Sequence, residues 1–189
     1  MNLLAHAVLS PTNEKILLGN VLADFIGRKE IESLDQDIQF GVALHKRIDH
    51  FTDHHTAVDR SKSRLVGFQR YGNALVDVFY DHFLTTGWSH ELSVREFTGR
   101  LYRSIQSHQE LLPKTCFAIA NRMIEQDWMN NYETMDGLKM NLGRMELRIE
   151  SRTGRAVDLV SSVKILEQEY RSFEEDFLEF WPELVGHTS

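Results

Sequence analysis

The sequence predicts an all-α protein, and three observations support this class. The chain of 189 residues has only 3 prolines, Pro11, Pro113 and Pro182, and each falls at a plausible helix boundary. No stretch alternates apolar and polar residues as a half-buried strand does, and no strong hairpin signal is present. Several stretches instead repeat apolar residues at three- and four-residue spacing. We therefore expect one helical domain over residues 1–189.

The first helices can be located from their start and stop signals. Ser10 and Pro11 can open a helix that runs through "KILLGNVLADFIG", with Gly27 near its end. Asp35 or Asp37 can open a second helix through "DQDIQFGVALHKRIDHF". These two segments carry most of the chemically informative side chains.

Three more helices follow in the middle of the chain. Asn73 can cap "ALVDVFYDHFL", which Gly87 then closes. The stretch from Ser93 to Glu96 has the form of a capping box ahead of another helix. Pro113 begins a helical segment through Trp128.

The clearest apolar periodicity is C-terminal. Its spacing alternates between four and three residues, which predicts one apolar helix face. That face is either a dimer interface or a surface that packs within its own domain, and we favour the second. Its members are Leu159, Val163, Leu166, Tyr170, Phe173, Phe177 and Phe180.

Composition excludes several classes of protein. The net charge of −7 argues against general nucleic-acid binding, because phosphate backbones need a cationic surface. The single cysteine, Cys116, excludes an internal disulfide and a cysteine-based zinc site, and we expect it to be buried. No stretch approaches the roughly 20 apolar residues of a membrane span, and the N-terminus lacks the basic leader of a signal peptide. We expect a cytoplasmic protein.

One short stretch, "GVALHKRIDHFTD", aligns ionisable side chains. His45, Asp49 and Asp53 lie four residues apart and therefore share one face of a helix. They form either a solvated face or one wall of a metal site, with Asp53 supporting the others or ending the helix.

Other segments place imidazole or carboxylate groups among apolar neighbours. His6 lies in "NLLAHAVL", Asp24 in "GNVLADFIG", and Asp77, Asp81 and His82 in "ALVDVFYDHFL". Burying an ionised carboxylate without a partner costs several kcal/mol. A divalent cation bound by imidazole nitrogen and carboxylate oxygen would satisfy all these groups together. A donor set without thiolate suits Mn, Fe, Mg or Zn.

Each of these residues also has an ordinary explanation when taken singly. His6 alone suits a core histidine, Asp24 can pair with Arg28, and Asp49 can pair with Lys46. The coincidence of four such segments is what favours a metal site.

A basic stretch in this acidic chain directly follows the His/Asp helix. Residues 60–76 contain no acidic residue but four basic ones. They form either a docking strip for an acidic partner or a phosphate, or a solvated face whose arginines pair with acids elsewhere. The basic residues of this strip are Arg60, Lys62, Arg64 and Arg70.

With these residues in view, the sequence resembles the acyl carrier protein phosphodiesterase family. The matching stretches are "MNLLAHAVLS", "GNVLADFIG", "GVALHKRIDHFTD", "VDVFYDHFL" followed by Trp88, and more loosely "WMNNY". They occur in the family's order and cover the first half of the chain. This chain has Thr56 where members often carry proline shortly after the "FTD" motif.

The resemblance implies a helical fold of the HD phosphohydrolase type and dependence on a divalent metal, with Mn²⁺ preferred and Mg²⁺ or Fe²⁺ as alternatives. The implied reaction hydrolyses holo acyl carrier protein to the apo protein and 4′-phosphopantetheine. The adjacent His-Asp pair that names the HD group does not occur here; His45 and Asp49 lie one turn apart instead.

A mechanism follows as a hypothesis, in which a metal-activated water attacks the phosphodiester. Lys46 or Arg47 stabilises the added phosphoryl charge, and His82 or His6 protonates the departing serine oxygen. Carrier proteins of this class are small and acidic, which favours the basic strip as their docking face. The predicted metal ligands are Asp24, His45, Asp49 and Asp81, with His6 as a further candidate, and they would hold one or two metal ions.

Two other functions remain open at this stage. The same set of metal ligands would suit an HD-type phosphohydrolase that acts on a nucleotide or another small phosphoester. A non-enzymatic helical binding module could use the His/Asp set as a buried hydrogen-bond network. Metal content separates the module from both enzymes.

Overall fold

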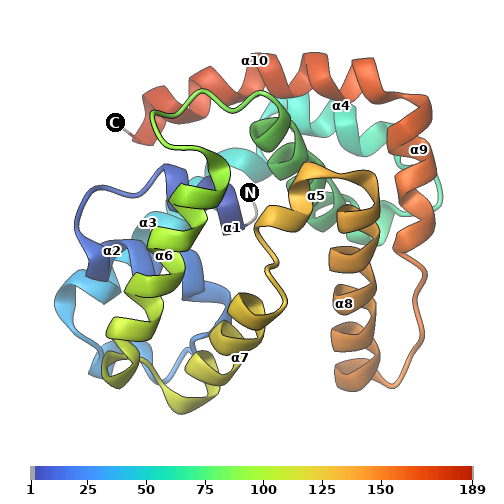
Figure 1. The fold of residues 1–189 in the computed structure, drawn as a ribbon. Coiled ribbons are helices and arrows are strands. Elements are labelled where there is room, and N and C mark those ends of the chain that lie inside the picture. The colour runs from blue at the N-terminus through green and yellow to red at the C-terminus, as the bar shows by residue number, and fades with distance from the viewer. Residues whose placement is uncertain (1–2, 189) are drawn as a thin grey trace. The chain divides into compact units, whose positions relative to one another are not determined.

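The computed structural model describes residues 3–188, and Figure 1 shows that these residues form helices joined by turns. The described part of the chain contains no strand, which confirms the all-α class. None of its helices combines the length and apolar character needed to cross a bilayer. The chain divides into two compact units, residues 3–50 with 88–130 (the first unit) and residues 51–87 with 131–188 (the second unit). The single domain over residues 1–189 and the HD-type topology both remain predictions.

The first unit holds the N-terminal helices and two helices from the middle of the chain. Its core contains Leu18, Leu22, Ile38, Leu101 and Cys116, all at most 2% exposed. The burial predicted for Cys116 is therefore confirmed. The elements of this unit are α1 (Leu3–Val8), α2 (Glu14–Leu22), η1 (Ala23–Phe25), η2 (Ile31–Ser33), α3 (Gln36–Asp53, up to residue 50), α6 (Val94–Ser107), η4 (Gln109–Leu111) and α7 (Lys114–Glu125).

The second unit packs the C-terminal helices around α5. Aromatic rings form much of its core, with Phe79 edge-on to Phe173 and Tyr80 edge-on to Phe177. The C-terminal apolar residues thus pack within this unit, as we favoured over a dimer interface. The elements are α4 (Thr56–Arg64), η3 (Gln69–Tyr71), α5 (Gly72–Thr86), η5 (Asn130–Glu133), α8 (Met135–Thr153), η6 (Val160–Ser162), α9 (Val163–Gln168) and α10 (Tyr170–Thr188).

Four helix boundaries follow the predicted capping chemistry. Asp35 Oδ1 accepts a hydrogen bond from the Asp37 amide (2.9 Å), so Asp35 is the residue that opens α3. Ser93 and Glu96 form the predicted capping box of α6. Gly87 closes α5 and Pro113 precedes α7, both as predicted, but α7 ends at Glu125 and not at Trp128.

The start predicted for α2 is wrong. Asn13 caps this helix, with its Oδ1 accepting from the Lys15 and Ile16 amides, and the helix begins at Glu14. The Ser10 hydroxyl donates instead to the His6 carbonyl at the end of α1 (2.8 Å). The helix also ends early, at Leu22, where the backbone tightens into a 3₁₀ turn.

Two other boundary predictions are also wrong. Asn73 does not cap α5, because the helix already begins at Gly72. The side-chain Nδ2 of Asn73 instead donates to Asp53 Oδ1 (2.9 Å). Pro182 lies inside α10 rather than at its boundary. The carbonyl that loses its donor there belongs to Leu178, whose side chain is 63% exposed, so water can replace the bond.

Candidate metal centre

The carboxylate of Asp49 contacts the Nε2 atoms of two imidazole rings of the first unit. His45 stands one turn earlier on α3, and its Nε2 is 3.0 Å from Asp49 Oδ2. His6 comes from α1, and its Nε2 is 3.2 Å from Asp49 Oδ1. The two rings stack with centroids 4.0 Å apart. His6, His45 and Asp49 thus offer ligand atoms that all lie within 4.8 Å of one another.

Asn20 on α2 orients both imidazoles. Its backbone carbonyl is 2.7 Å from His45 Nδ1, and its Oδ1 is 2.9 Å from His6 Nδ1. The amide cannot turn over, because its Nδ2 donates to the His6 carbonyl and to Ser10 Oγ. Both Nδ1 atoms therefore carry the proton, and both Nε2 atoms point their lone pairs at Asp49 when the rings are neutral.

Two glycines allow this arrangement, because they let α2 and α3 cross in backbone contact. A Cβ at Gly41 would collide with the Ile16 carbonyl oxygen and would lie 2.8 Å from Gly19 Cα. His45 follows Gly41 by one turn, and Asn20 follows Gly19 directly. The close crossing is therefore what brings the Asn20 carbonyl within hydrogen-bond distance of His45.

Asp24 lies at the solvent side of the cluster. It belongs to the 3₁₀ turn that follows α2, and its Oδ1 is 3.5 Å from His45 Nε2. Its side chain is 72% exposed, whereas the His45 side chain is 7% exposed. Asp24 is thus placed where a ligand to a cation would also face water.

The charges of the cluster are strongly coupled. Burial lowers the pKa of His6 to about 4, although the contact with Asp49 opposes this shift. Burial also disfavours a charged His45, but its contacts with Asp24 and Asp49 outweigh burial and raise its pKa to about 9. Burial raises the pKa of Asp49, and the two imidazoles more than reverse this, so the carboxyl stays ionised. The cluster therefore favours one positive charge between its carboxylates.

The donor set fits a divalent cation. His45 Nε2 is buried and, despite its short distance to Asp49, forms no hydrogen bond of acceptable geometry. A cation placed among the three side chains would take this nitrogen, His6 Nε2 and a carboxylate oxygen as ligands. Nitrogen and oxygen donors without thiolate match Mn²⁺, Fe²⁺ or Zn²⁺.

Two predicted site residues belong to the second unit. Asp81 is fully buried on α5. His82 Nδ1 lies 2.7 Å from the Tyr132 carbonyl, and its Nε2 lies 3.0 Å from the Tyr170 hydroxyl. Both ring nitrogens of His82 are thus occupied within that unit. The ligand role of Asp81 and the acid role of His82 remain predictions.

The remaining α3 residues lie outside the cluster. Lys46 is exposed, and its side chain leaves the helix about 100° away from that of His45. Its catalytic role remains a prediction. Asp53 is the last residue of α3, where it accepts from Asn73, which confirms the alternative that it ends the helix.

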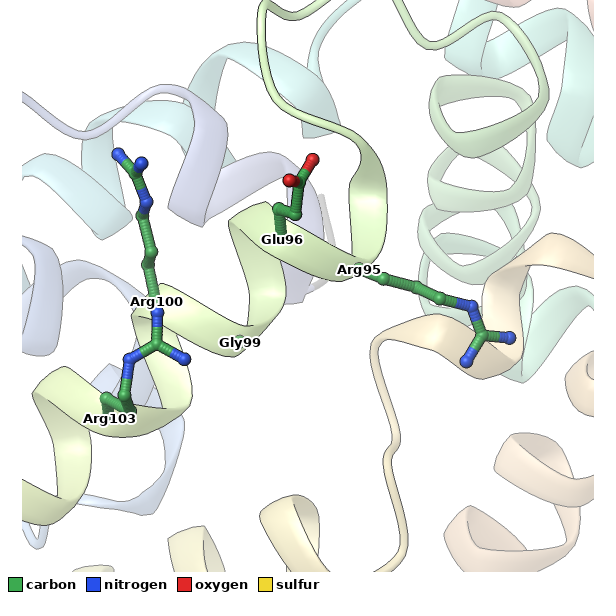
Figure 2. Close-up of a pocket in the computed structure, with 5 residues that line it drawn as sticks. All are labelled: Arg95, Glu96, Gly99, Arg100 and Arg103. Atoms are coloured by element: carbon green, nitrogen blue, oxygen red, sulfur yellow. The ribbon is translucent and has the colours of Figure 1, made fainter.

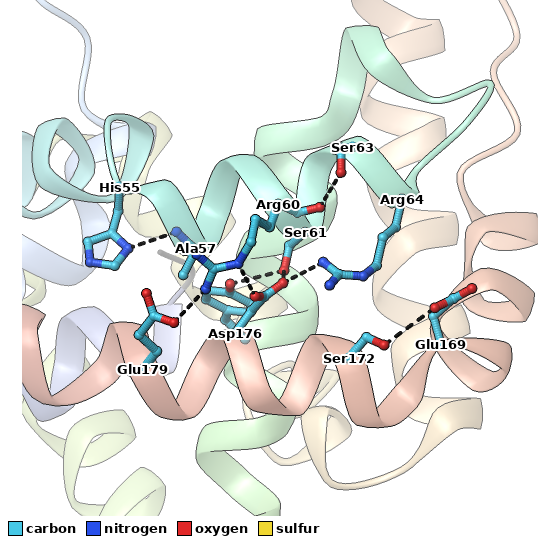
Figure 3. A network of polar contacts seen from close by, with 11 residues as sticks. His55, Ala57, Arg60, Ser61, Ser63, Arg64, Glu169, Ser172, Asp176 and Glu179 are labelled. Atoms are coloured by element: carbon cyan, nitrogen blue, oxygen red, sulfur yellow. Dashed lines mark hydrogen bonds and ion pairs between the residues drawn. The ribbon is translucent and has the colours of Figure 1, made fainter.

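Two arginines of the predicted docking strip pair with acids of α10. Figure 3 shows Arg60 and Arg64 converging on Asp176, which is 3% exposed. Arg60 also pairs with Glu179, at 2.6 Å. Lys62 pairs with Asp59, and Arg70 lies over the Tyr71 ring. These contacts match the alternative interpretation of the strip, and its docking role remains a prediction.

Sequence reasoning missed Asn20. The signal was present, because Asn20 is an uncharged polar residue within the apolar run "KILLGNVLADFIG" and is fully buried. A buried amide needs hydrogen-bond partners, so its position predicts a structural contact.

Fold and site together define a class: an all-α protein with a His-His-Asp candidate centre for a divalent cation. The family model described as acyl carrier protein phosphodiesterase matches residues 1–184. Two relatives, the acyl carrier protein phosphodiesterases of Escherichia coli O6:H1 and O45:K1, are each 30% identical to this chain. The similarity covers 100% of this chain and 98% of each relative. No solved structure matches the chain.

The chain therefore belongs to the acyl carrier protein phosphodiesterase family. This confirms the resemblance inferred from its motifs.

Proposed function

We propose that this protein hydrolyses the phosphodiester that joins 4′-phosphopantetheine to a serine of holo acyl carrier protein. One observation carries the proposal beyond the family match. The stretches "MNLLAHAVLS", "GNVLADFIG" and "GVALHKRIDHFTD" are distant in sequence, yet they supply His6, Asn20 with Asp24, and His45 with Asp49 to one cluster. Three of the five stretches on which the family resemblance depends thus contribute to the candidate metal centre.

The proposed cofactor is one divalent cation, with Mn²⁺ preferred. His6, His45 and Asp49 would hold it, and Asp24 would complete its ligands on the solvent side. A cation bound there acts as a Lewis acid on a phosphoryl group and lowers the pKa of coordinated water.

The side chains of the cluster also limit the roles of His6. Its Nδ1 contacts Asn20, its Nε2 contacts Asp49, and burial lowers its pKa to about 4. A histidine that is neutral and doubly engaged at pH 7 suits a metal ligand better than a proton donor. His6 is therefore assigned to the metal.

The experiment is to incubate the purified protein with holo acyl carrier protein and Mn²⁺, with and without chelator, and to weigh the carrier by mass spectrometry. We expect a metal-dependent loss of the phosphopantetheine mass. Asp49→Asn keeps the side-chain size but removes the charge between the imidazoles, and we expect activity to fall by more than about 100-fold, beyond the effect of losing an outer contact. Asp53→Asn, one turn further on the same helix, is the matched control and should retain activity.

Each outcome separates the possible functions. An unchanged carrier mass with bound Mn²⁺ would refute the carrier as substrate and favour a small phosphoester. Full activity of Asp49→Asn would refute the cluster as the catalytic centre. A protein that neither retains Mn²⁺ nor gains thermal stability from it would refute the metal centre and favour a binding module.

A further inference from the structure

Ser10 lies in the turn between α1 and α2, just after the end of α1. Its hydroxyl donates to the carbonyl of His6, one helical turn earlier, at 2.8 Å. The hydroxyl oxygen also accepts a hydrogen bond from Asn20 Nδ2, at 2.9 Å. Ser10 therefore contacts both the backbone of His6 and the side-chain amide that orients the His6 ring.

The Ser10 hydroxyl, the Asn20 amide and the His6 carbonyl form a closed ring of hydrogen bonds. The carbonyl accepts from the hydroxyl and from Asn20 Nδ2 (2.8 Å), and the second N–H of Nδ2 goes to Ser10 Oγ. Asn20 is fully buried, so its amide needs partners within the protein. A buried network whose members are all satisfied holds its side chains in one arrangement.

The orientation of the Asn20 amide determines which nitrogen of His6 carries the proton. In the observed orientation Oδ1 accepts from His6 Nδ1 (2.9 Å), so the lone pair of Nε2 is available to a cation. In the reversed orientation Nδ2 would donate to Nδ1, and the ring proton would move to Nε2. A proton at Nε2 would occupy the position that the cation needs.

The Ser10 hydroxyl disfavours the reversed orientation. Reversal would place Oδ1 of Asn20 against the His6 carbonyl oxygen and would remove both hydrogen bonds that Nδ2 donates. The hydroxyl can donate to the reversed amide only if it gives up its bond to the His6 carbonyl. Without the hydroxyl, reversal would remove one donated bond instead of two.

We propose that Ser10 is a positioning residue of the metal centre, which holds the Asn20 amide so that His6 Nε2 faces the cation without a proton. Ser10 is not itself a ligand and acts on the metal affinity through Asn20. The residue that does not cap α2 would thus support the centre instead. This inference rests on the metal centre of the proposed function.

The test compares Ser10→Ala with the parent in the full-length protein. Long-range ¹H–¹⁵N NMR of the metal-free protein at pH 7 determines the tautomer of the His6 ring, which is neutral at this pH because burial lowers its pKa to about 4. Titration calorimetry then measures the Kd of Mn²⁺, and thermal melting measures stability. Ser10→Thr is the conservative variant, because threonine keeps the hydroxyl.

The matched control is Ser107→Ala at the end of α6. Ser107 Oγ also donates to the carbonyl one helical turn earlier, that of Arg103, at 2.9 Å. Figure 2 shows Arg103 beside an open cleft of α6, and the lining of this cleft contains no residue of the metal centre. The control thus removes the same kind of hydrogen bond without touching the Asn20 amide.

We expect the parent to carry the His6 proton at Nδ1, and Ser10→Ala to show a second population with the proton at Nε2. Binding of Mn²⁺ by Ser10→Ala should weaken about 3- to 10-fold, which corresponds to the loss of one ordinary hydrogen bond. Ser10→Thr and Ser107→Ala should both keep the tautomer and the affinity of the parent.

The outcomes separate a positioning role from a purely structural one. A lower Tm of Ser10→Ala with an unchanged tautomer, or with unchanged Mn²⁺ affinity, would overturn the inference. Equal losses in Ser107→Ala or in Ser10→Thr would also overturn it, because the position or the hydroxyl would then not matter.

Failure of the proposed function is distinguishable from failure of this inference. A parent that binds Mn²⁺ but does not cleave the carrier would refute the hydrolysis, and the predicted losses in Ser10→Ala would still support the positioning role. A parent that binds no Mn²⁺ would refute the metal centre and, with it, the role of Ser10 in metal affinity.

Discussion

Gly41→Ala tests the contact on which the candidate metal centre depends. An alanine at this position would drive its Cβ into the Ile16 carbonyl and to 2.8 Å from the Asn20 amide nitrogen. These are backbone atoms of α2, so no side-chain rotation can relieve the collision. The two helices must separate, and the bond between His45 Nδ1 and the Asn20 carbonyl must lengthen with them.

Two effects of opposite sign set the magnitude. Alanine in the middle of a helix gains about 1 kcal/mol over glycine. Overpacking against atoms that cannot move costs about 1 to 3 kcal/mol or more, and a backbone collision belongs at or above the upper end. We expect a net loss of about 2 kcal/mol in the free energy of unfolding, and, at about 2 to 4 °C per kcal/mol, a fall in Tm of about 4 to 8 °C.

The matched control is Gly143→Ala in the middle of α8. There the nearest neighbour of a new Cβ is a methyl group of Val160 at 3.9 Å, which is ordinary contact. The helix-propensity gain should appear alone and raise Tm by about 2 to 4 °C. The same chemical change is thus expected to move stability in opposite directions at the two sites.

Calorimetric melting and manganese titration measure both consequences. Gly41→Ala should lower Tm and weaken Mn²⁺ binding, because His45 loses the contact that orients its ring. Unchanged Tm together with unchanged Mn²⁺ affinity in Gly41→Ala would refute the close helix crossing as the support of the site.

The remaining predictions concern the support of the centre and the stability of each unit. Asn20→Ala should weaken Mn²⁺ binding about 10- to 100-fold in a titration, and an unchanged affinity would contradict its orienting role. Asp176→Ala should cost about 3 kcal/mol in denaturant unfolding, because it removes the carboxylate that pairs with the mostly buried Arg64 and accepts from the buried Ser61 hydroxyl. Arg60→Ala should cost less, since Arg60 is half-exposed and Asp176 keeps its contact with Arg64; equal costs would contradict this. Burial raises the pKa of Cys116 to about 12, so iodoacetamide should label it at pH 8 only after unfolding, and rapid labelling of folded protein would disprove its burial. Because the unfolded thiol ionises first, its contribution to the free energy of unfolding should decline as pH rises above about 9.

The parts of the site that depend on local spacing could be predicted from sequence. His45 and Asp49 share a helix face because four residues make about one turn, and the structure places them in contact. The capping box of α6 and the closure of α5 at Gly87 are equally local. Each of these predictions needed only the geometry of one helix.

The parts that depend on tertiary packing could not be predicted in the same way. Arg60 pairs with Asp176, which lies 116 positions further along the chain, so no local pattern predicts this contact. Asn20 carries no charge, so the burial argument that singled out the carboxylates passed over it. The start of α2 was misplaced because two nearby polar residues, Ser10 and Asn13, compete for the capping role, and tertiary contacts of Ser10 decide the outcome.

The close approach of Gly19 and Gly41 links the local spacing within α3 to the tertiary packing of α3 on α2. A helical pattern alone gives His45 and Asp49 a common face, but it does not determine whether that face meets water or another helix. Gly19 and Gly41 permit a crossing so close that a backbone carbonyl of α2 reaches the His45 ring, and this contact fixes the tautomer that leaves Nε2 free for a cation. Two missing side chains are therefore as much a part of the candidate centre as the side chains that would bind the metal.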